Sequence, residues 1–247
     1  MSLCPEGISD FRNGECNIMK TKKVCFTELA YVFGIITLAL GTALMTKADF
    51  GVSMVVAPAY LLHLKISQYF TAYTFGVSEY IFQAVLLIVL TVVMRKFKKS
   101  YIFSFITAVI YGFTLDFAMF AIGGLPFDSI VLRCVFYLVG LLLSSIGVAF
   151  FFHTYIAPEA YELFVKEVST KYNIKIDKVK TVYDCCSCLL AIILSFVFFG
   201  FGHFEGIKAG TIVVTLVNGW LIGRMSRLLE SLFMFKDAFK LRDKFDR

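Results

Sequence analysis

Residues 131–152 read VLRCVFYLVGLLLSSIGVAFFF, an apolar run interrupted by a single charged residue, Arg133. A helix needs about 20 predominantly apolar residues to cross the hydrocarbon core of a bilayer. Similar runs occupy residues 26–46, 72–94, 101–122, 181–201 and 208–228. We therefore predict an all-α polytopic membrane protein with six transmembrane helices.

The composition of the whole chain favours the same class. Of its 247 residues, 59% are hydrophobic and only 17% are charged, whereas soluble domains contain about 25% charged residues. The 28 phenylalanines would leave a soluble surface too apolar to remain monodisperse. The seven cysteines are an odd number and four lie in apolar runs, where thiols behave as small hydrophobes. We therefore exclude a soluble domain, a disordered chain and a disulfide framework.

The positive charges predict the orientation of the six helices. Lys and Arg precede the first run, separate the second from the third and the fourth from the fifth, and follow the sixth. Cationic loops stay in the cytoplasm, so both termini are predicted there. This accounts for the net charge of +6 without nucleic acid as a partner. We expect a cytoplasmic extension at residues 1–24, a membrane domain at 25–230 and a basic cytoplasmic tail at 231–247.

Two connecting segments are too apolar or too long to be simple loops. Residues 49–66 contain Pro58 and predict a short re-entrant or interfacial helix. Residues 155–180 contain Pro158 and continue with apolar residues at spacings of three and four, which predicts an amphipathic helix on the cytoplasmic face.

The order of features repeats along the chain. APAY at residues 57–60 resembles APEAY at 157–161, Glu79 corresponds to Asp184, and Tyr111-Gly112 corresponds to Asn218-Gly219. We infer two repeats, at about 26–122 and 131–228. Because each holds three membrane helices, the second must be inverted relative to the first, an architecture that recurs in secondary transporters. Accidental similarity between halves is the alternative.

Residues 44–53 (LMTKADFGVS) resemble the K-A-D-[LF]-G-V-S signature of the YczE/YyaS/YitT group of bacterial membrane proteins. Further matches occur at Tyr111-Gly112, Asp116, and residues 157–161, 180–184 and 210–211. The resemblance covers about residues 30–230. It implies a polytopic protein of the bacterial cytoplasmic membrane and names no substrate. Many members have Pro where this chain has Met54, so the start of the short helix is expected to differ.

Ionisable residues inside a membrane usually face the protein interior or a wet cavity. Asp49 closes the first run, where capping of backbone N–H groups competes with ligand binding as its role. Glu79 has no basic residue within one helical turn. It is either hydrogen-bonded to a tyrosine near the interface or a carboxylate that binds a proton or cation. For Asp116, deep in the third run, structural and functional roles both remain open.

Three further polar residues complete the candidate substrate- or ion-binding set. Lys180 and Asp184 are four residues apart, a spacing that permits an ion pair on one helix face. Asn218 either joins two helices or binds substrate. The neighbouring Gly219 and Gly223 permit close helix packing, which we expect within the monomer, with a homodimer as the alternative.

No motif for catalysis or for a cofactor was found. The chain has no phosphate-binding G-x-x-x-x-G-K-[ST] loop, no G-x-S-x-G and no H-E-x-x-H. Cys185 and Cys188 form one C-x-x-C pair, whereas structural zinc requires four ligands. We expect no enzyme, no metal and no cofactor.

Our leading hypothesis is a secondary transporter of an unidentified small solute or ion, working by alternating access and coupled to protons through Glu79 or Asp184. The alternative is a non-transporting membrane scaffold or regulator, which would dock partners through the amphipathic cytoplasmic helix and the basic tail.

Overall fold

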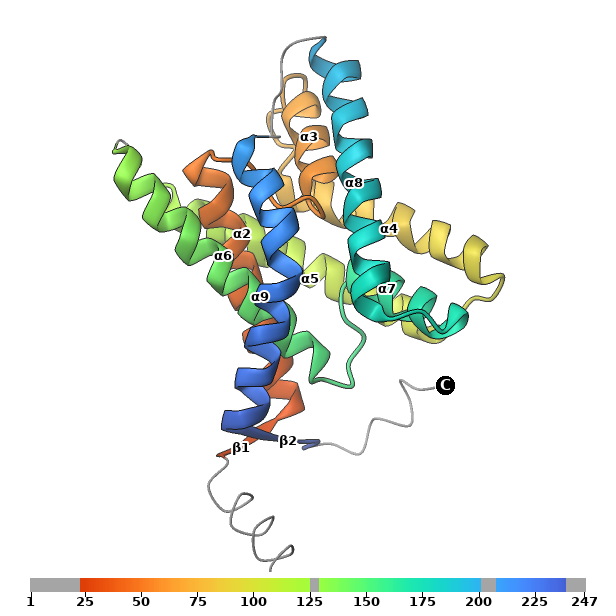
Figure 1. The fold of residues 1–247 in the computed structure, drawn as a ribbon. Coiled ribbons are helices and arrows are strands. Elements are labelled where there is room, and N and C mark those ends of the chain that lie inside the picture. Colours follow the sequence, from red (N-terminus) through yellow and green to blue (C-terminus); the bar gives the residue numbers. More distant parts are fainter. Residues whose placement is uncertain (1–22, 125–128, 201–207, 239–247) are drawn as a thin grey trace, which may run out of the picture.

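The computed structural model describes residues 23–124, 129–200 and 208–238, and this part of the chain is almost entirely helical (Figure 1). The long helices are α2 (Thr27–Ala48), α4 (Phe75–Met94), α5 (Lys99–Ile122), α6 (Ile130–Phe152), α8 (Ile176–Phe199) and α9 (Ala209–Leu232). The short helices are α3 (Ala57–Ile66) and α7 (Ala160–Tyr172), and the strands are β1 (Lys23–Phe26) and β2 (Phe233–Lys236).

Five of the described helices, α2, α4, α5, α6 and α8, are long and apolar enough to cross a membrane. The prediction of an all-α polytopic membrane protein is confirmed at this level. The sixth helix, α9, forms where it was predicted, but Arg224 and Arg227 lie in its second half. Its crossing of the membrane stays a prediction. Three predicted segments lie partly outside the described residues. These are the N-terminal extension (residues 1–22), the end of the fifth run (residue 201) and the C-terminal tail (residues 239–247).

The centre of the bundle is the crossing of α2 and α6. A Cβ atom on Gly41 would lie 2.5 Å from the backbone nitrogen of Ser144 and 2.6 Å from the carbonyl oxygen of Gly140. Small residues permit this close approach of two helix backbones. Around this pair, α2 packs on α5 and α6 packs on α9, while α3 and α7 each contact both α4 and α8.

The strands β1 and β2 form a parallel pair that the sequence did not predict. Lys23 lies opposite Phe233 and Phe26 opposite Lys236. Figure 1 shows this pair at one end of the bundle, where α2 begins and α9 ends. The two ends of the helical domain therefore lie at the same end of the molecule.

The segment between α2 and α3 turns sharply and enters the bundle. Gly51 has a φ of 107°, a conformation that glycine adopts without strain, and a Cβ atom there would collide with the hydroxyl of Thr211 on α9. Beyond it, Val52, Val55 and Val56 are buried, and Pro58 lies in the first turn of α3. Gly51 thus lets this segment pass in close contact with the first turn of α9.

Candidate functional site

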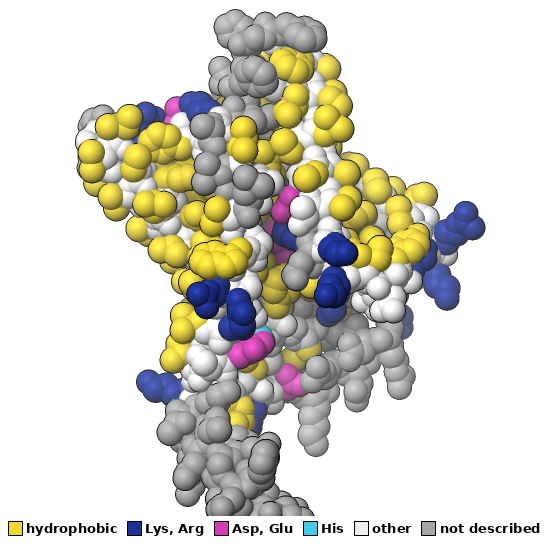
Figure 2. Space-filling model, viewed as in Figure 1, with side chains coloured by type: hydrophobic (Ala, Val, Ile, Leu, Met, Phe, Trp, Pro, Cys, Tyr) yellow, Lys and Arg dark blue, Asp and Glu magenta, His cyan; other side chains and the backbone are white. Residues whose placement is uncertain are grey.

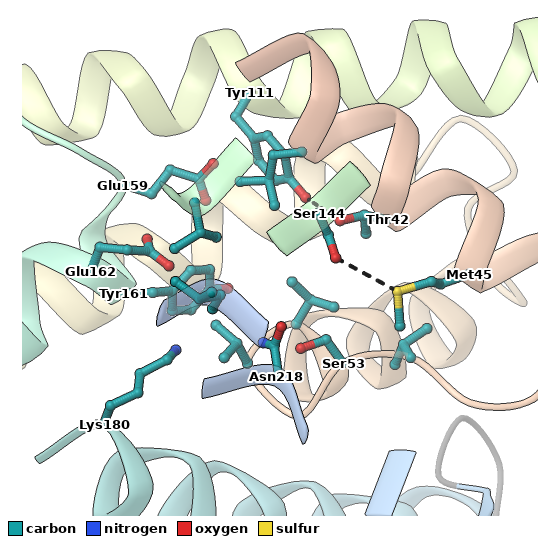
Figure 3. A pocket seen from close by; sticks show the side chains of 16 residues that line it. Thr42, Met45, Ser53, Tyr111, Ser144, Glu159, Tyr161, Glu162, Lys180 and Asn218 are labelled. Atoms are coloured by element: carbon teal, nitrogen blue, oxygen red, sulfur yellow. Dashed lines mark hydrogen bonds between the residues drawn. The ribbon is translucent and has the colours of Figure 1, made fainter. Parts of the chain in front are cut away.

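A small cavity lies at the middle of the bundle, between α2, α5, α6, α8, α9 and the start of α7 (Figure 3). Its volume available to the centres of water-sized molecules is about 40 Å³. One water needs roughly 10–15 Å³ by this measure, so the cavity has room for a few waters or one small polar group. Its polar lining comprises Thr42, Ser53, Tyr111, Ser144, Glu159, Tyr161, Glu162, Lys180 and Asn218.

Two carboxylates enter the cavity from the start of α7. Glu159 is the N-cap residue and Glu162 lies in the first turn, and their spacing of three places both on one side of the helix. They are only 2% and 6% exposed. Glu159 Oε1 and Glu162 Oε2 have no hydrogen-bond partner. Figure 3 shows both carboxylates pointing into the cavity.

Glu79 and Gln83, one turn apart on α4, connect that helix to the start of α7. The hydroxyl of Tyr161 donates a hydrogen bond of 2.9 Å to Glu79 Oε2. The side-chain amide of Gln83 donates to Glu159 Oε2 at 3.0 Å and accepts from the backbone N–H of Ala160 at 3.0 Å. Glu79 is fully buried, and its second oxygen has no hydrogen-bond partner.

The opposite wall of the cavity comes from α8 and α9. The ammonium of Lys180 lies 3.3 Å from Asp184 Oδ1, so the ion pair that the spacing predicts is formed, and both side chains are largely buried. Asn218 on α9 accepts a hydrogen bond of 3.3 Å from Ser145 on α6. Asn218 and Lys180 both line the cavity, where Figure 3 shows the ammonium directed towards the side of Glu162 and Tyr161.

The cluster carries more acidic than basic groups. Glu79, Glu159, Glu162 and Asp184 are all buried, whereas Lys180 is the only lysine or arginine among the described residues that line the cavity. Burial raises the pKa of Glu159, and the neighbouring carboxylates of Glu162 and Glu79 raise it further. Burial also raises the pKa of Glu162, against the opposing effect of Lys180. Because a buried charge is unfavourable unless it is paired, the cluster is suited to holding protons or a cation.

Asp116 and Asp49, which the sequence grouped with this site, lie elsewhere. Asp116 accepts hydrogen bonds from the hydroxyl of Thr74 at 2.6 Å and from the backbone N–H of Gly76 at 2.8 Å, so it stabilises the start of α4. Asp49 lies 2.7 Å from Lys208 and 3.5 Å from Arg133. Among the described residues, no backbone N–H group that the Asp49 carboxylate caps was found.

The sequence analysis did not identify Glu159, Glu162 or Gln83 as site residues. Gln83 follows Glu79 by four residues on one helix face, which was an available signal. Glu159 and Glu162 looked like exposed residues at the start of an interfacial helix. Only the packing of α7 against α4 and α8 shows that this start is buried.

The helix pair α4–α5 is closely packed, whereas the pair α8–α9 is not. On α4 and α5, a Cβ atom on Gly76 would collide with the carbonyl oxygen of Gly112, so these helices touch. On α9, a Cβ atom on Gly219 or Gly223 would meet no atom within 4 Å. The expected packing of these two glycines within the monomer is therefore wrong among the described residues, because α9 contacts α8 over only a short stretch.

A groove of about 300 Å³ runs between α8 and α9. Its lining includes Met54, Cys188, Leu189, Ile192, Ile212 and Thr215. Figure 2 shows a recess between these helices with acidic and basic side chains at its base. The charged interior is thus close to an apolar opening on the side of the bundle.

Comparison with known proteins gives a family. No curated protein and no solved structure matches the chain. Residues 25–227, which include the cavity, the groove and every described long helix except the last turn of α9, match the Family of unknown function (DUF6198). The chain therefore belongs to this family of unknown function.

Proposed function

We propose that the protein is a secondary transporter of a small solute and works by alternating access between two inverted repeats. The observation that carries the proposal is the buried cavity between the halves, where the carboxylates of Glu159 and Glu162 have oxygens without partners. Ionisable groups buried in a membrane protein usually mark a substrate or ion pathway. The proposal requires no cofactor and no enzymatic step.

The packing of the helices supports the inverted repeat. In the first half α3 contacts α4 and reaches across to α8, and in the second half α7 contacts α8 and reaches across to α4. The hydroxyl of Tyr111 donates to Thr42 at 3.0 Å, tying α5 to α2. Ser145 and Asn218 tie α6 to α9 in the same way. These bonds join corresponding positions of the two proposed repeats, as the pairing of Tyr111 with Asn218 predicts.

The unequal packing of the two halves supports a transport cycle. In inverted-repeat transporters, one half moves against the other around a site near the midplane. In the first half, α4 and α5 are in close contact at Gly76 and Gly112, whereas in the second half α9 has open space at Gly219. During a transport cycle, each half would change from one of these arrangements to the other. The second state would then close α8 against α9 and separate α4 from α5.

The proposal includes the finer predictions from the sequence. These are six crossings with both termini in the cytoplasm, a location in the bacterial cytoplasmic membrane, and a relationship to the YczE/YyaS/YitT group. The pairing of β1 with β2 at one end of the bundle supports an even number of crossings.

Cysteine labelling tests alternating access without knowledge of the substrate. In a chain whose native cysteines are replaced by serine, Ser144→Cys places one thiol in the cavity wall. Membrane-impermeant maleimide is applied from either side of oriented vesicles. Lys96→Cys and Ser129→Cys, exposed before α5 and α6, are the controls that report the two sides.

We expect the Ser144→Cys thiol to react from both sides, and each control thiol to react from one side only. A thiol that reacts from neither side, or from one side only, contradicts the transporter and favours a scaffold with a static bundle.

A further inference from the structure

We take the cavity and the groove as the inner and outer parts of one passage, because both are lined by neighbouring turns of α8 and α9. Lys180, Asp184 and Cys188 follow each other at intervals of one turn on α8, and Asn218 and Thr215 lie one turn apart on α9. Lys180 and Asn218 line the cavity, and Asp184 pairs with Lys180. Cys188 and Thr215 line the groove. Moving along this face, a ligand would pass from a charged site to an apolar one.

The inner part of this passage contains carboxylate oxygens that accept no hydrogen bond. Glu159 and Glu162 line the cavity, and each has one buried oxygen that accepts no hydrogen bond. Both side chains are more than nine-tenths buried. Lys180 is already held by Asp184. A positively charged N–H group would satisfy these oxygens and balance their charge.

The outer part offers apolar volume. Its size of about 300 Å³ is at the lower end of the range for small-molecule sites, which are mostly apolar with a few placed polar groups. The side chains of Leu189, Ile192 and Ile212 belong to its lining. Such a surface favours hydrocarbon over a sugar or a hydrated inorganic ion.

We propose that the cavity and the groove together bind an organic cation with an apolar body, such as a protonated amine. The charged nitrogen would lie against Glu159 and Glu162, and the hydrocarbon part would lie between α8 and α9. This inference names the substrate class of the proposed transporter and rests on that proposal.

Protons compete with such a ligand for the same carboxylates. The titratable groups that interact with Glu162 are Glu159 beside it, Glu79 on α4, Tyr111 on α5, and Lys180, Tyr183 and Asp184 on α8. A carboxylic acid must lose its proton before it can pair with an ammonium. The affinity for the cation therefore increases as the pH rises, up to the pH at which the ligand loses its own proton.

Equilibrium dialysis of radiolabelled phenethylammonium against the full chain in lipid nanodiscs tests the proposal. 2-Phenylethanol, of similar shape and without charge, and methylammonium, without an apolar body, are the matched probes. We expect saturable binding of phenethylammonium and at least tenfold weaker binding of either matched probe. Raising the pH from 6 to 8 should strengthen binding of phenethylammonium.

Substitutions locate the two halves of the site. Glu162→Gln and Glu159→Gln should each weaken phenethylammonium binding at least tenfold. Glu167→Gln, on the same helix but paired with Lys98 and outside the cavity lining, should leave it unchanged. Cys188→Phe fills the groove and should weaken binding of phenethylammonium more than that of methylammonium.

Equal binding of phenethylammonium and 2-phenylethanol, or binding that is insensitive to pH in the unmodified chain, overturns the proposal even if a variant fails to fold. Tighter binding of methylammonium or potassium shows a small-cation site instead and also overturns it. If the Ser144→Cys thiol still reacts from both sides, the transporter stands and only the substrate class is wrong. Binding without two-sided labelling contradicts the transporter and leaves a cation-binding membrane protein.

Discussion

Tyr161 and Glu79 are joined by a hydrogen bond of 2.9 Å. The bond connects α7, the short helix of the second proposed repeat, to α4 in the first. Both side chains are almost completely buried, at 1% and 0% exposed. The bond holds one carboxylate oxygen of Glu79 and leaves the other without a partner. It is therefore both a contact between the halves and part of the acidic cluster.

Tyr161→Phe should destabilise the fold by about 1–3 kcal/mol, because it leaves a second buried oxygen of Glu79 without a hydrogen bond. For a chain of this size, such a change lowers the midpoint of thermal unfolding by roughly 2–4 °C per kcal/mol. The measurement is thermal unfolding in detergent. Tyr172→Phe, at an exposed position at the end of α7, is the control and should change little. Equal midpoints for the two variants would contradict the structural role of the bond.

Gly41→Ala should separate α2 from α6. The added methyl group would lie against backbone atoms of Gly140 and Ser144, which cannot rotate away. Overpacking of this kind costs about 1–3 kcal/mol, measured as a lower unfolding midpoint. Gly219→Ala adds the same methyl group to a helix with open space around it, and should leave stability unchanged or raise it by up to about 1 kcal/mol. Destabilisation by Gly219→Ala, or none by Gly41→Ala, would show that the helix packing differs from that described.

The stability of the ligand-free protein should fall as the pH rises above 4.5, the ordinary pKa of glutamate. Burial raises the pKa of Glu159 and Glu162 in the fold. Above pH 4.5 the unfolded chain has released these protons while the fold still holds them. The folded state then binds more protons than the unfolded state, so its free energy of unfolding decreases with pH.

Unfolding midpoints between pH 5 and 8 test this dependence. Glu162→Gln carries no ionisable group at this position and should flatten the decrease. Glu167→Gln, on the same helix but paired with Lys98 away from the cluster, should retain it. A midpoint that rises with pH in the unmodified chain would mean that the cluster is ionised and paired in the fold.

The helices were predictable because length and hydropathy are properties of a single segment. The predicted run at 131–152 and the helix Ile130–Phe152 differ by one residue. The Lys180–Asp184 pair was predictable for the same reason, since both residues belong to one turn of one helix. The strands β1 and β2 were not, because their four-residue segments pair across nearly the whole chain.

The composition of the site depended on packing between helices. Glu159 and Glu162 follow Pro158 in a segment with many charges, which predicts a solvated helix start. Their burial requires α4 and α8 to cover that start, which is information that residues 155–180 do not contain. Asp116 is the converse case, because an acid in an apolar helix is compatible with a structural or a functional role and the sequence left both open. In the fold, Asp116 accepts hydrogen bonds from Thr74 and Gly76 at the start of α4.

Gly219→Leu should block transport without unfolding the protein. In the described state, a Cβ atom at this position would meet no atom within 4 Å, so we expect the fold to accommodate the larger side chain. In the proposed second state, α8 packs on α9 as α4 packs on α5 at Gly76 and Gly112, and the leucine would prevent this contact. Labelling of the Ser144→Cys thiol in this variant should therefore occur from one side of the membrane only. Gly124→Leu, at an equally open glycine after α5, is the control and should retain labelling from both sides. Two-sided labelling of the Gly219→Leu protein would mean that α8 and α9 do not close against each other, and the proposed exchange of packing between the halves would be wrong.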